Sequence, residues 1–248
     1  MVLTKPRVLL VYPPISKMDR YGSELGVFGG KQIPLGVFCL AAYLRQQGYS
    51  VQAVDAEARE LTNDDLVAEL RAGSYDVLGI SSTTVAFHRS LQLAQAVKAA
   101  RPETIVVIGG PHVSSQPDHP LQHEAFDYAV RNEGEETLDE LLQRIADHGD
   151  PRGVRGLIYR QNGQIVVNPC RPYIADLDTL PFPAYDMLPD MRIYSPPPFN
   201  FKRLPVANIM TSRGCPNACT FCENTTFGRQ FRMRSAESIV ANLSIGLK

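Results

Sequence analysis

The amino-acid sequence predicts an α/β fold, in which a doubly wound parallel sheet is followed by a smaller second unit. Two observations lead to this prediction. Between residues 1 and 147, short apolar runs alternate about five times with segments of helical period, and such alternation is typical of a parallel sheet covered by helices on both faces. Beyond this pattern, three of the five cysteines lie close together near the C-terminal end.

The strands are predicted from apolar, β-branched runs that end in turn residues. The first covers residues 7–14 and stops at two prolines, which cannot continue a central strand. The same pattern recurs at residues 51–54, 76–82, 104–110 and 127–132.

The helices are predicted from apolar residues at spacings of three and four. Residues 35–47 carry such a stripe and end before Gly48. Thr62 is a suitable N-cap with Asp65 three residues later, which predicts a helix to about Ala72. Two further apolar faces, at residues 93–100 and 138–145, complete the alternation.

Composition excludes several classes of protein. The 248 residues carry 25 basic and 26 acidic side chains, for a formal charge of −1, so no overall charge attracts nucleic acid or an anionic membrane. The longest apolar stretch, residues 35–44, is about half of the ~20 residues that span a bilayer. No signal-peptide cleavage pattern begins the chain. We expect a cytoplasmic protein with no membrane span and no nucleic-acid partner.

The residues that follow the predicted strands indicate a ligand site. In a doubly wound sheet the ligand lies outside the carboxyl ends of the strands, and small or hydroxyl residues there allow close approach and hydrogen bonding. These residues are Tyr12, Pro13 and Pro14; Ser81, Ser82, Thr83 and Thr84; Gly109, Gly110, Pro111 and His112; and Glu133, Gly134 and Glu135. The alternative is that they only form tight turns. No G-x-G-x-x-G follows the first strand, so the dinucleotide fingerprint is absent.

A linker separates this unit from the cysteines. Residues 157–168 predict a hairpin around Asn162-Gly163, which we interpret as a connector. Residues 170–205 contain eight of the 19 prolines and predict an extended segment. Cys170 in this linker and Cys39 in the first unit have no nearby cysteine, and we interpret both as ordinary thiols.

The cysteine cluster carries the strongest chemical signal. Cys215, Cys219 and Cys222 form a C-x3-C-x2-C array between a predicted strand at residues 206–210 and a helix opening at Ser235. An odd number of clustered cysteines argues against a disulfide framework. A closed zinc site needs four ligands, yet no histidine follows residue 148 and no fourth cysteine lies nearby. An iron-sulfur cluster with one open iron suits three thiolates better.

Positive charge surrounds this array. Between residues 201 and 234 there is one acid, Glu223, and there are six basic residues: Lys202, Arg203, Arg213, Arg229, Arg232 and Arg234. Positive charge favours thiolates and offsets an anionic cluster. The alternative is that these arginines form a solvated face.

The segment resembles the first βα unit of the barrel in the radical S-adenosylmethionine (radical SAM) superfamily, on the cysteine spacing, the aromatic Phe221 before the last cysteine, and the flanking elements. The resemblance implies that Cys215, Cys219 and Cys222 bind a 4Fe-4S cluster. It further implies that the open iron binds S-adenosylmethionine, that Phe221 lies near its adenine, and that a low-potential donor such as flavodoxin or ferredoxin reduces the cluster.

The first unit is similar to the flavodoxin-like, cobalamin-binding Rossmann domain that precedes the barrel in one branch of this superfamily. The matches are Tyr12-Pro13-Pro14, Ser81 to Thr84, Gly109 to His112, and Glu133 to Glu135, which the resemblance implies contact cobalamin. The D-x-H-x-x-G pattern that supplies a lower cobalt ligand in other cobalamin proteins is missing, because the chain reads ISKMDRYG there. Cobalamin held without a histidine ligand, or a domain that has lost cobalamin, would both account for this. His88 and His112 are possible ligands, but each is more often an ordinary loop residue.

These resemblances predict three regions: residues 1–147 as the cobalamin-binding-like domain, 148–204 as hairpin and Pro-rich linker, and 205–248 as an incomplete radical SAM domain. The last region has 44 residues, whereas a complete barrel takes about 200 or more, so we expect a fragment of a longer enzyme. The implied function is methyl transfer to an unactivated centre of a small-molecule or natural-product substrate. The alternatives are a radical cyclase or rearrangement enzyme of the same branch, and a non-catalytic cobalamin-binding module.

Overall fold

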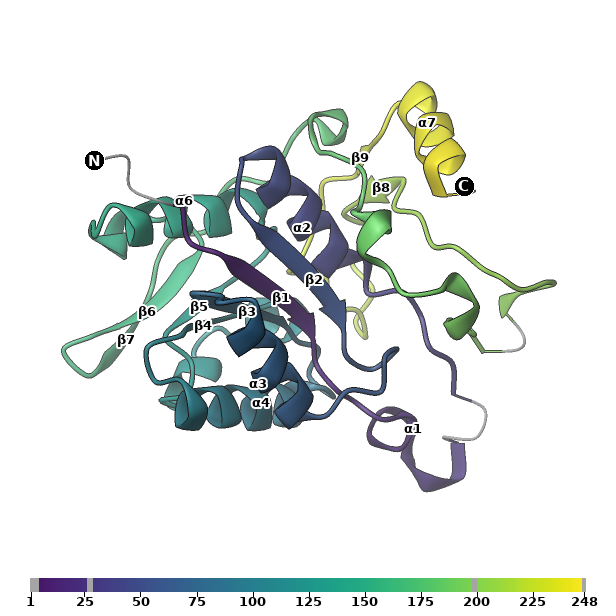
Figure 1. The fold of residues 1–248 in the computed structure, drawn as a ribbon. Coiled ribbons are helices and arrows are strands. Elements are labelled where there is room, and N and C mark those ends of the chain that lie inside the picture. The colour runs from purple at the N-terminus through teal and green to yellow at the C-terminus, as the bar shows by residue number, and fades with distance from the viewer. Residues whose placement is uncertain (1–4, 26–28, 198–199, 247–248) are drawn as a thin grey trace.

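The computed structural model describes residues 5–25, 29–197 and 200–246. It confirms the predicted fold class, because a mostly parallel sheet forms the centre of the chain and helices cover both of its faces (Figure 1). The sheet has the strand order β2-β1-β3-β4-β5-β6-β7. Its strands are β1 Val8–Tyr12, β2 Val51–Asp55, β3 Val77–Ser81, β4 Ile105–Gly109, β5 Tyr128–Val130, β6 Leu157–Gln161 and β7 Gln164–Val167. The first five are parallel to one another.

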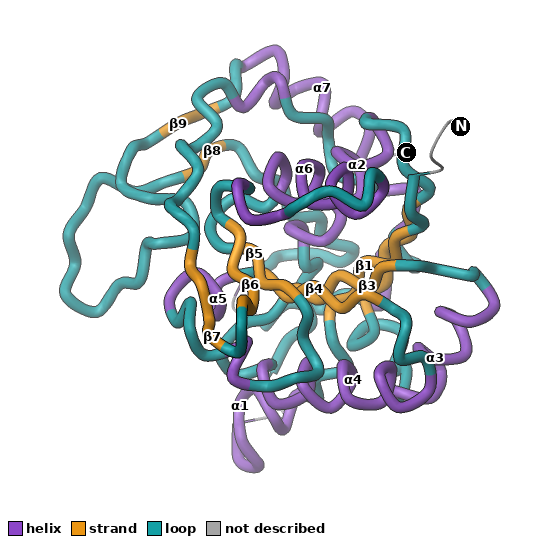
Figure 2. The backbone as a smooth tube through the Cα atoms, turned by 90° about the vertical axis from the view of Figure 1, so that its left-hand side faces the viewer, coloured by secondary structure: helices purple, strands orange, loops and turns teal. Residues whose placement is uncertain are grey.

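Two pairs of helices enclose the sheet. Figure 2 shows α2 (Leu35–Gln46) and α6 (Glu135–Ala146) on one face and α3 (Asn63–Ala72) and α4 (Phe87–Ala100) on the other. Alternate residues of β1 serve the two resulting cores: Val8 and Leu10 pack with the α2 and α6 side, whereas Leu9 packs with the α3 and α4 side. Such burial on both faces explains why the strands read as continuous apolar runs.

The start of α3 agrees with the prediction from its sequence. The Thr62 side chain accepts a hydrogen bond from the Asp65 amide, and the Asp65 carboxylate accepts one from the Thr62 amide. This reciprocal arrangement is a capping box, which satisfies amides that the first helical turn leaves without partners.

The predicted hairpin forms, but our interpretation of it as a connector was wrong. β6 pairs antiparallel with β5, and β7 pairs with β6, so the hairpin extends the sheet. Its turn has positive φ at Asn162 (51°) and Gly163 (77°), the geometry that a two-residue hairpin turn requires. Ile158 is fully buried and Tyr159 nearly so, in the cores on opposite faces. The hairpin therefore contributes to both cores.

The Pro-rich segment runs along the first unit in extended conformation, with short 3-10 turns at Leu177–Thr179, Tyr185–Met187 and Met191–Ile193. It is held by specific contacts. The Ala184 amide donates to the Phe38 carbonyl oxygen at 3.0 Å. The buried Tyr194 hydroxyl donates to an Asp55 carboxylate oxygen at 2.9 Å.

The predicted strand at residues 206–210 is absent, and this expectation was wrong. Instead, β8 (Ser212–Arg213) and β9 (Arg232–Met233) form a two-residue antiparallel ladder. A strand persists only where a neighbour accepts its hydrogen bonds, and β9 pairs with residues 212 and 213 alone. The predicted helix does form, as α7 (Ala236–Gly246).

The remaining elements are short. They are α1 (Lys17–Leu25), α5 (Pro111–Ser115), and 3-10 turns at Pro120–Gln122 and Pro151–Gly153. In the parts of the chain that the structure describes, no helix combines the length and apolar character needed to cross a membrane.

Candidate functional site

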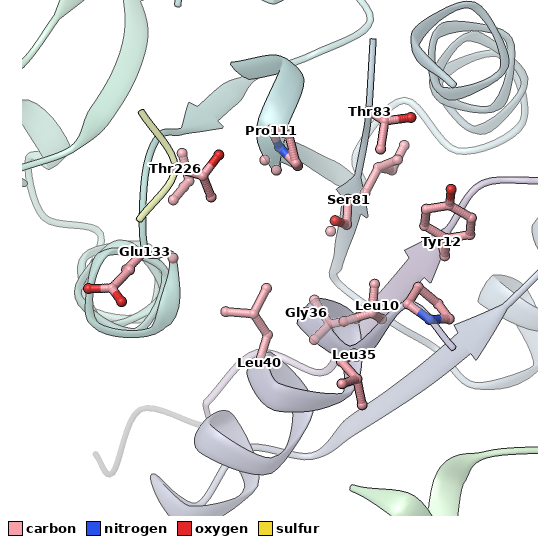
Figure 3. Close-up of a pocket in the computed structure, with 18 of the residues that line it drawn as sticks. Leu10, Tyr12, Leu35, Gly36, Leu40, Ser81, Thr83, Pro111, Glu133 and Thr226 are labelled. Carbon is pink, nitrogen blue, oxygen red and sulfur yellow. The ribbon is translucent and has the colours of Figure 1, made fainter. Parts of the chain in front are cut away.

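A cavity of about 660 Å³ opens at the carboxyl ends of the parallel strands, on the face covered by α2 and α6. Figure 3 shows side chains from several elements arranged around it, with Tyr12 and Thr83 across from Glu133 and Thr226. Four neighbouring strands each contribute to its apolar floor, through Leu10, Gly79, Val107 and Val130. The first turns of α2 supply Leu35, Gly36 and Leu40.

Glycines line the cavity where other parts of the chain pack closely or where space is open. A Cβ on Gly79 would lie 2.6 Å from Leu10 Cδ2, so a side chain there would crowd the floor. Gly110 has φ of +97°, and its Cβ would lie 2.8 Å from the Ser82 carbonyl oxygen. A Cβ on Gly36 would meet nothing within 4 Å, because that residue faces open space. The cavity is thus broad, apolar at its floor and bordered by backbone.

Most residues predicted from the strand ends line this cavity. They are Tyr12, Ser81, Thr83, Gly109, Gly110, Pro111, Glu133, Gly134 and Glu135. Pro13, Ser82, Thr84, His88 and His112 are not among its lining, and Pro14 lines a second hollow of about 490 Å³. The buried Ser82 side chain donates to the Thr83 carbonyl oxygen and accepts from the Ser90 hydroxyl.

His112 serves the packing beside the cavity. It is 3% exposed, its ring centroid lies 4.4 Å from that of Phe87, and its Nε2 lies 2.9 Å from His119 Nδ1. Its Nδ1 lies 3.2 Å from the Thr84 hydroxyl. Burial lowers the pKa of His112, and the neighbouring His119 lowers it further. His112 therefore has the features of a structural histidine: it is buried, and both of its ring nitrogens contact polar groups.

The sequence interpretation missed α1, which brings Arg20 and Tyr21 to the cavity. The Arg20 guanidinium donates to the Tyr12 hydroxyl at 2.9 Å and pairs with the buried Glu57 carboxylate. Burial raises the pKa of Tyr12, so its hydroxyl stays protonated. A signal for this helix was present, because Ser16 caps its start and bonds reciprocally with Asp19.

The cysteine-bearing segment forms one wall of the same cavity, through Met210, Arg213, Thr226 and Phe227. Arg213 is buried and pairs with Glu133 at 2.9 Å and with Glu135 at 2.6 Å. Arg232 is also buried and pairs with Glu133 at 2.9 Å. These two arginines therefore neither form a solvated face nor stand free to offset an anionic cluster, because carboxylates of the first unit neutralise them.

Cys215, Cys219 and Cys222 are exposed, in the loop between β8 and β9. Backbone hydrogen bonds within this loop run from Cys215 N to the Gly228 carbonyl oxygen and from Cys222 N to that of Cys219, both at 3.1 Å, and from Gly228 N to the Asn224 carbonyl oxygen at 2.8 Å. Among the described residues, no three His, Cys, Asp or Glu side chains are grouped to hold a metal ion. The donor chemistry fits an iron-sulfur cluster, but the loop does not gather the three thiols, so their role stays a prediction.

The other residues of the sequence hypothesis lie apart from the cavity. Phe221 is 92% exposed and is not among the lining residues. Burial raises the pKa of Cys39 to about 12, so this thiol stays protonated at neutral pH. Cys170 is exposed in the linker.

Comparison with known proteins agrees with this geometry. The model of the B12-binding domain matches residues 25–142. An uncharacterised methyltransferase of Pyrococcus horikoshii is 33% identical over 96% of this chain and 50% of its own length. The anaerobic magnesium-protoporphyrin IX monomethyl ester cyclase of Rubrivivax gelatinosus is 30% identical over 98% of this chain and 43% of its own length. The chain thus spans about half the length of these curated relatives.

A solved structure shares the fold. The cobalamin-dependent S-adenosylmethionine radical enzyme OxsB, with aqua-cobalamin bound, superposes with a TM-score of 0.78 at 22% identity, over 98% of this chain and 32% of the enzyme. The match covers both the B12-binding region and the cysteine-bearing segment. The cavity at the strand ends, the cysteine-bearing segment that forms one of its walls and these relatives lead to one conclusion: the chain belongs to the family of radical S-adenosylmethionine proteins with a B12-binding domain.

Proposed function

We propose that this chain is the cobalamin- and cluster-binding part of a radical S-adenosylmethionine enzyme that transfers a methyl group to an unactivated centre of a small-molecule or natural-product substrate. One observation carries the proposal. The strand ends of the B12-binding domain and the cysteine-bearing segment line a single cavity. A cofactor bound in the cavity and a cluster held by the cysteine loop would therefore be neighbours.

The lining of the cavity suits cobalamin, part of which would fill it. Its apolar floor and glycine-rich rim accept a large, flat group, and the hydroxyls of Tyr12, Ser81 and Thr83 can hydrogen-bond polar substituents. No histidine is among the described residues that line it. We therefore expect cobalamin to bind without a histidine ligand to cobalt, and an absorption titration reports both its affinity and its ligation.

The cysteine loop suits a cluster with one open iron. When bound, a reduced 4Fe-4S cluster supplies the electron that cleaves S-adenosylmethionine, and cobalamin supplies the transferable methyl group. The chain's own contribution is to hold three thiolates and to present the exposed Phe221 beside Cys222, where an adenine can stack. Exposure of the loop leaves it open to an electron donor such as flavodoxin or ferredoxin.

Cluster binding is tested by anaerobic reconstitution followed by iron and sulfide analysis. We expect about four irons per chain, as in a 4Fe-4S cluster. Cys215→Ala, Cys219→Ala and Cys222→Ala should each lose most of this iron, whereas the matched controls Cys39→Ala and Cys170→Ala should keep it. Unchanged iron in all three loop variants refutes the assignment, and one equivalent of bound zinc would instead indicate a structural metal site.

Relatives that are cyclases support a second candidate, in which the radical forms a ring. The products released from S-adenosylmethionine separate the candidates. S-adenosylhomocysteine together with 5′-deoxyadenosine indicates methyl transfer, 5′-deoxyadenosine alone indicates ring formation, and neither indicates a non-catalytic cobalamin module. From the 248-residue chain we expect slow, uncoupled release of 5′-deoxyadenosine, because the two short strands β8 and β9 and the helix α7 cannot enclose a substrate.

A further inference from the structure

Four buried charges join the cysteine-bearing segment to the B12-binding domain. Arg213 on β8 bridges Glu133 and Glu135, and Arg232 on β9 pairs with Glu133. The side chains of all four residues are at most 6% exposed. Arg213 and Arg232 are also direct partners in the β8–β9 ladder. The two strands that bracket the cysteine loop are therefore fixed to one pair of carboxylates.

The second half of the cysteine loop is held by the B12-binding domain, by the linker and by Arg232 of its own segment. The Thr225 carbonyl oxygen accepts hydrogen bonds from the Tyr173 hydroxyl at 2.7 Å and from the Asn132 side-chain amide. Arg232 donates to the Phe227 carbonyl oxygen at 2.9 Å. Thr226 and Phe227 line the cavity beside these contacts, whereas the three cysteines are exposed. The loop thus has a docked half at the cavity and an exposed half that carries the thiols.

A network of this kind fixes position more than it adds stability. Its two arginines and two carboxylates are balanced in charge, and removal of one member leaves a buried charge without a partner, at a much higher cost than breaking an exposed pair. Arg213, Glu133 and Glu135 also line the cavity. A ligand that fills the cavity therefore contacts the same side chains that hold the base of the loop.

We propose that Glu133, Glu135, Arg213 and Arg232 form a positioning clamp that couples occupation of the cavity to the conformation of the cysteine loop. This inference rests on the proposed function, in which the cavity binds cobalamin. By thermodynamic linkage, the two equilibria change by the same factor. If docking of the loop raises the affinity of the cavity for its ligand, binding of the ligand raises the equilibrium constant for docking of the loop equally. Cobalamin binding would thereby prepare the cysteines for the cluster.

The coupling is measured as the rate at which N-ethylmaleimide labels each cysteine, resolved by peptide mass spectrometry, with and without saturating cyanocobalamin. In the wild-type chain we expect cobalamin to change the labelling rates of Cys215, Cys219 and Cys222 by about tenfold, within the usual range of such coupling, because the ligand contacts the side chains that hold the base of their loop. Cys170 is an exposed reference outside the loop and should not respond.

Variants then test the clamp itself. Arg213→Gln combined with Glu135→Gln removes one positive and one negative charge and leaves the pair of Arg232 with Glu133. We expect this variant to bind cobalamin without the change in labelling rates that the wild-type chain shows. Arg213→Lys keeps the charge but cannot bridge two carboxylates in the same planar geometry, so its response should be reduced in a folded chain. The matched control is Arg45→Gln with Asp186→Asn, which removes an exposed pair between α2 and the linker and should behave as wild type.

The outcomes separate the inference from the proposed function. An absorption titration measures cobalamin binding independently of labelling. No binding to the wild-type chain overturns both the proposed function and the clamp. Binding with no change in cysteine labelling overturns the clamp alone. A full response in Arg213→Lys and in the charge-balanced double variant also overturns it, because a purely stabilising network would lower unfolding midpoints without altering the ligand-dependent ratio of labelling rates.

Discussion

Replacing Gly110 with alanine should destabilise the chain and weaken ligand binding in the cavity. Gly110 follows β4, lines the cavity and has φ of +97°. An added Cβ would lie 2.8 Å from the Ser82 carbonyl oxygen and 2.9 Å from its amide nitrogen, both of them backbone atoms that cannot move aside without distorting the strand end. The matched control is Gly163→Ala, which has φ of +77° in the hairpin turn and nothing within 4 Å of its Cβ.

The two substitutions differ in both backbone strain and packing. Gly110, with φ of 97° and ψ of −172°, lies in a region that is essentially restricted to glycine and costs another residue about 1–3 kcal/mol, whereas positive φ in the hairpin turn costs alanine about 1–2 kcal/mol at Gly163. Overpacking against the Ser82 backbone adds about 1–3 kcal/mol at Gly110 only. The change in unfolded-state entropy on replacing glycine is common to both sites and cancels in the comparison. We therefore expect a loss in unfolding free energy of about 2–6 kcal/mol for Gly110→Ala and about 1–2 kcal/mol for Gly163→Ala.

Urea unfolding followed by far-ultraviolet circular dichroism measures this difference, and equal slopes would show that the denatured states are alike. A cobalamin titration of the same variants should show weaker binding for Gly110→Ala and unchanged binding for Gly163→Ala. If Gly110→Ala unfolds at the same urea concentration as the control, the close approach of residue 110 to the Ser82 backbone does not constrain the fold. The argument that this edge of the cavity requires a glycine then fails.

Three further predictions address burial and charge. Tyr194→Phe should lower the unfolding free energy by about 1–3 kcal/mol in urea titrations, because it removes a hydrogen bond to the buried Asp55; an unchanged midpoint would contradict this. His112→Gln should reduce the loss of stability between pH 7.5 and 5.5: burial lowers the folded-state pKa of His112, so its contribution is present above the unfolded pKa of about 6.5 and is lost as pH falls. An equal loss in wild type and variant would show that His112 does not titrate as proposed. At pH 8, Cys39 should react with maleimide far more slowly than Cys170, because burial raises the pKa of Cys39 to about 12; comparable rates, followed by peptide mass spectrometry, would refute its burial.

The local sequence pattern predicts best those elements whose buried residues recur at a regular spacing. Residues 35–46 and 63–72 form helices close to the expected bounds. The Thr62 cap could be predicted because its hydrogen-bond partner, Asp65, lies only three residues away in the sequence. The cavity followed from the same logic. Parallel strands bring their carboxyl ends to one edge, so residues as distant in sequence as Tyr12 and Glu133 were expected at one site and line it together.

What the sequence pattern missed depends on partners distant in the chain. The run at residues 206–210 has a strand-like composition, but its nearest ladder pairs only residues 212 and 213. Counting charge around the cysteines could not reveal that Arg213 pairs with a carboxylate 80 positions earlier. The hairpin signal at Asn162-Gly163 was correct, yet nothing local shows that its first strand pairs with β5. The cysteine spacing is likewise a local signal, and the role of the three thiols remains a prediction.

The central claim is that one chain holds two cofactors at separate but adjoining sites, cobalamin in the cavity and an iron-sulfur cluster on the cysteine loop. The most direct test is to measure bound cobalt and iron together, after anaerobic reconstitution with both cofactors, in the wild-type chain and two variants. Gly36→Phe places a ring in the open space of the cavity, and the triple variant Cys215→Ser, Cys219→Ser, Cys222→Ser removes the loop thiols.

At saturating cobalamin, the account predicts that the wild-type chain retains both metals, that Gly36→Phe loses cobalt but can still bind iron, and that the triple cysteine variant loses iron but can still bind cobalt. Full retention of cobalt by Gly36→Phe, or of iron by the triple variant, would contradict it.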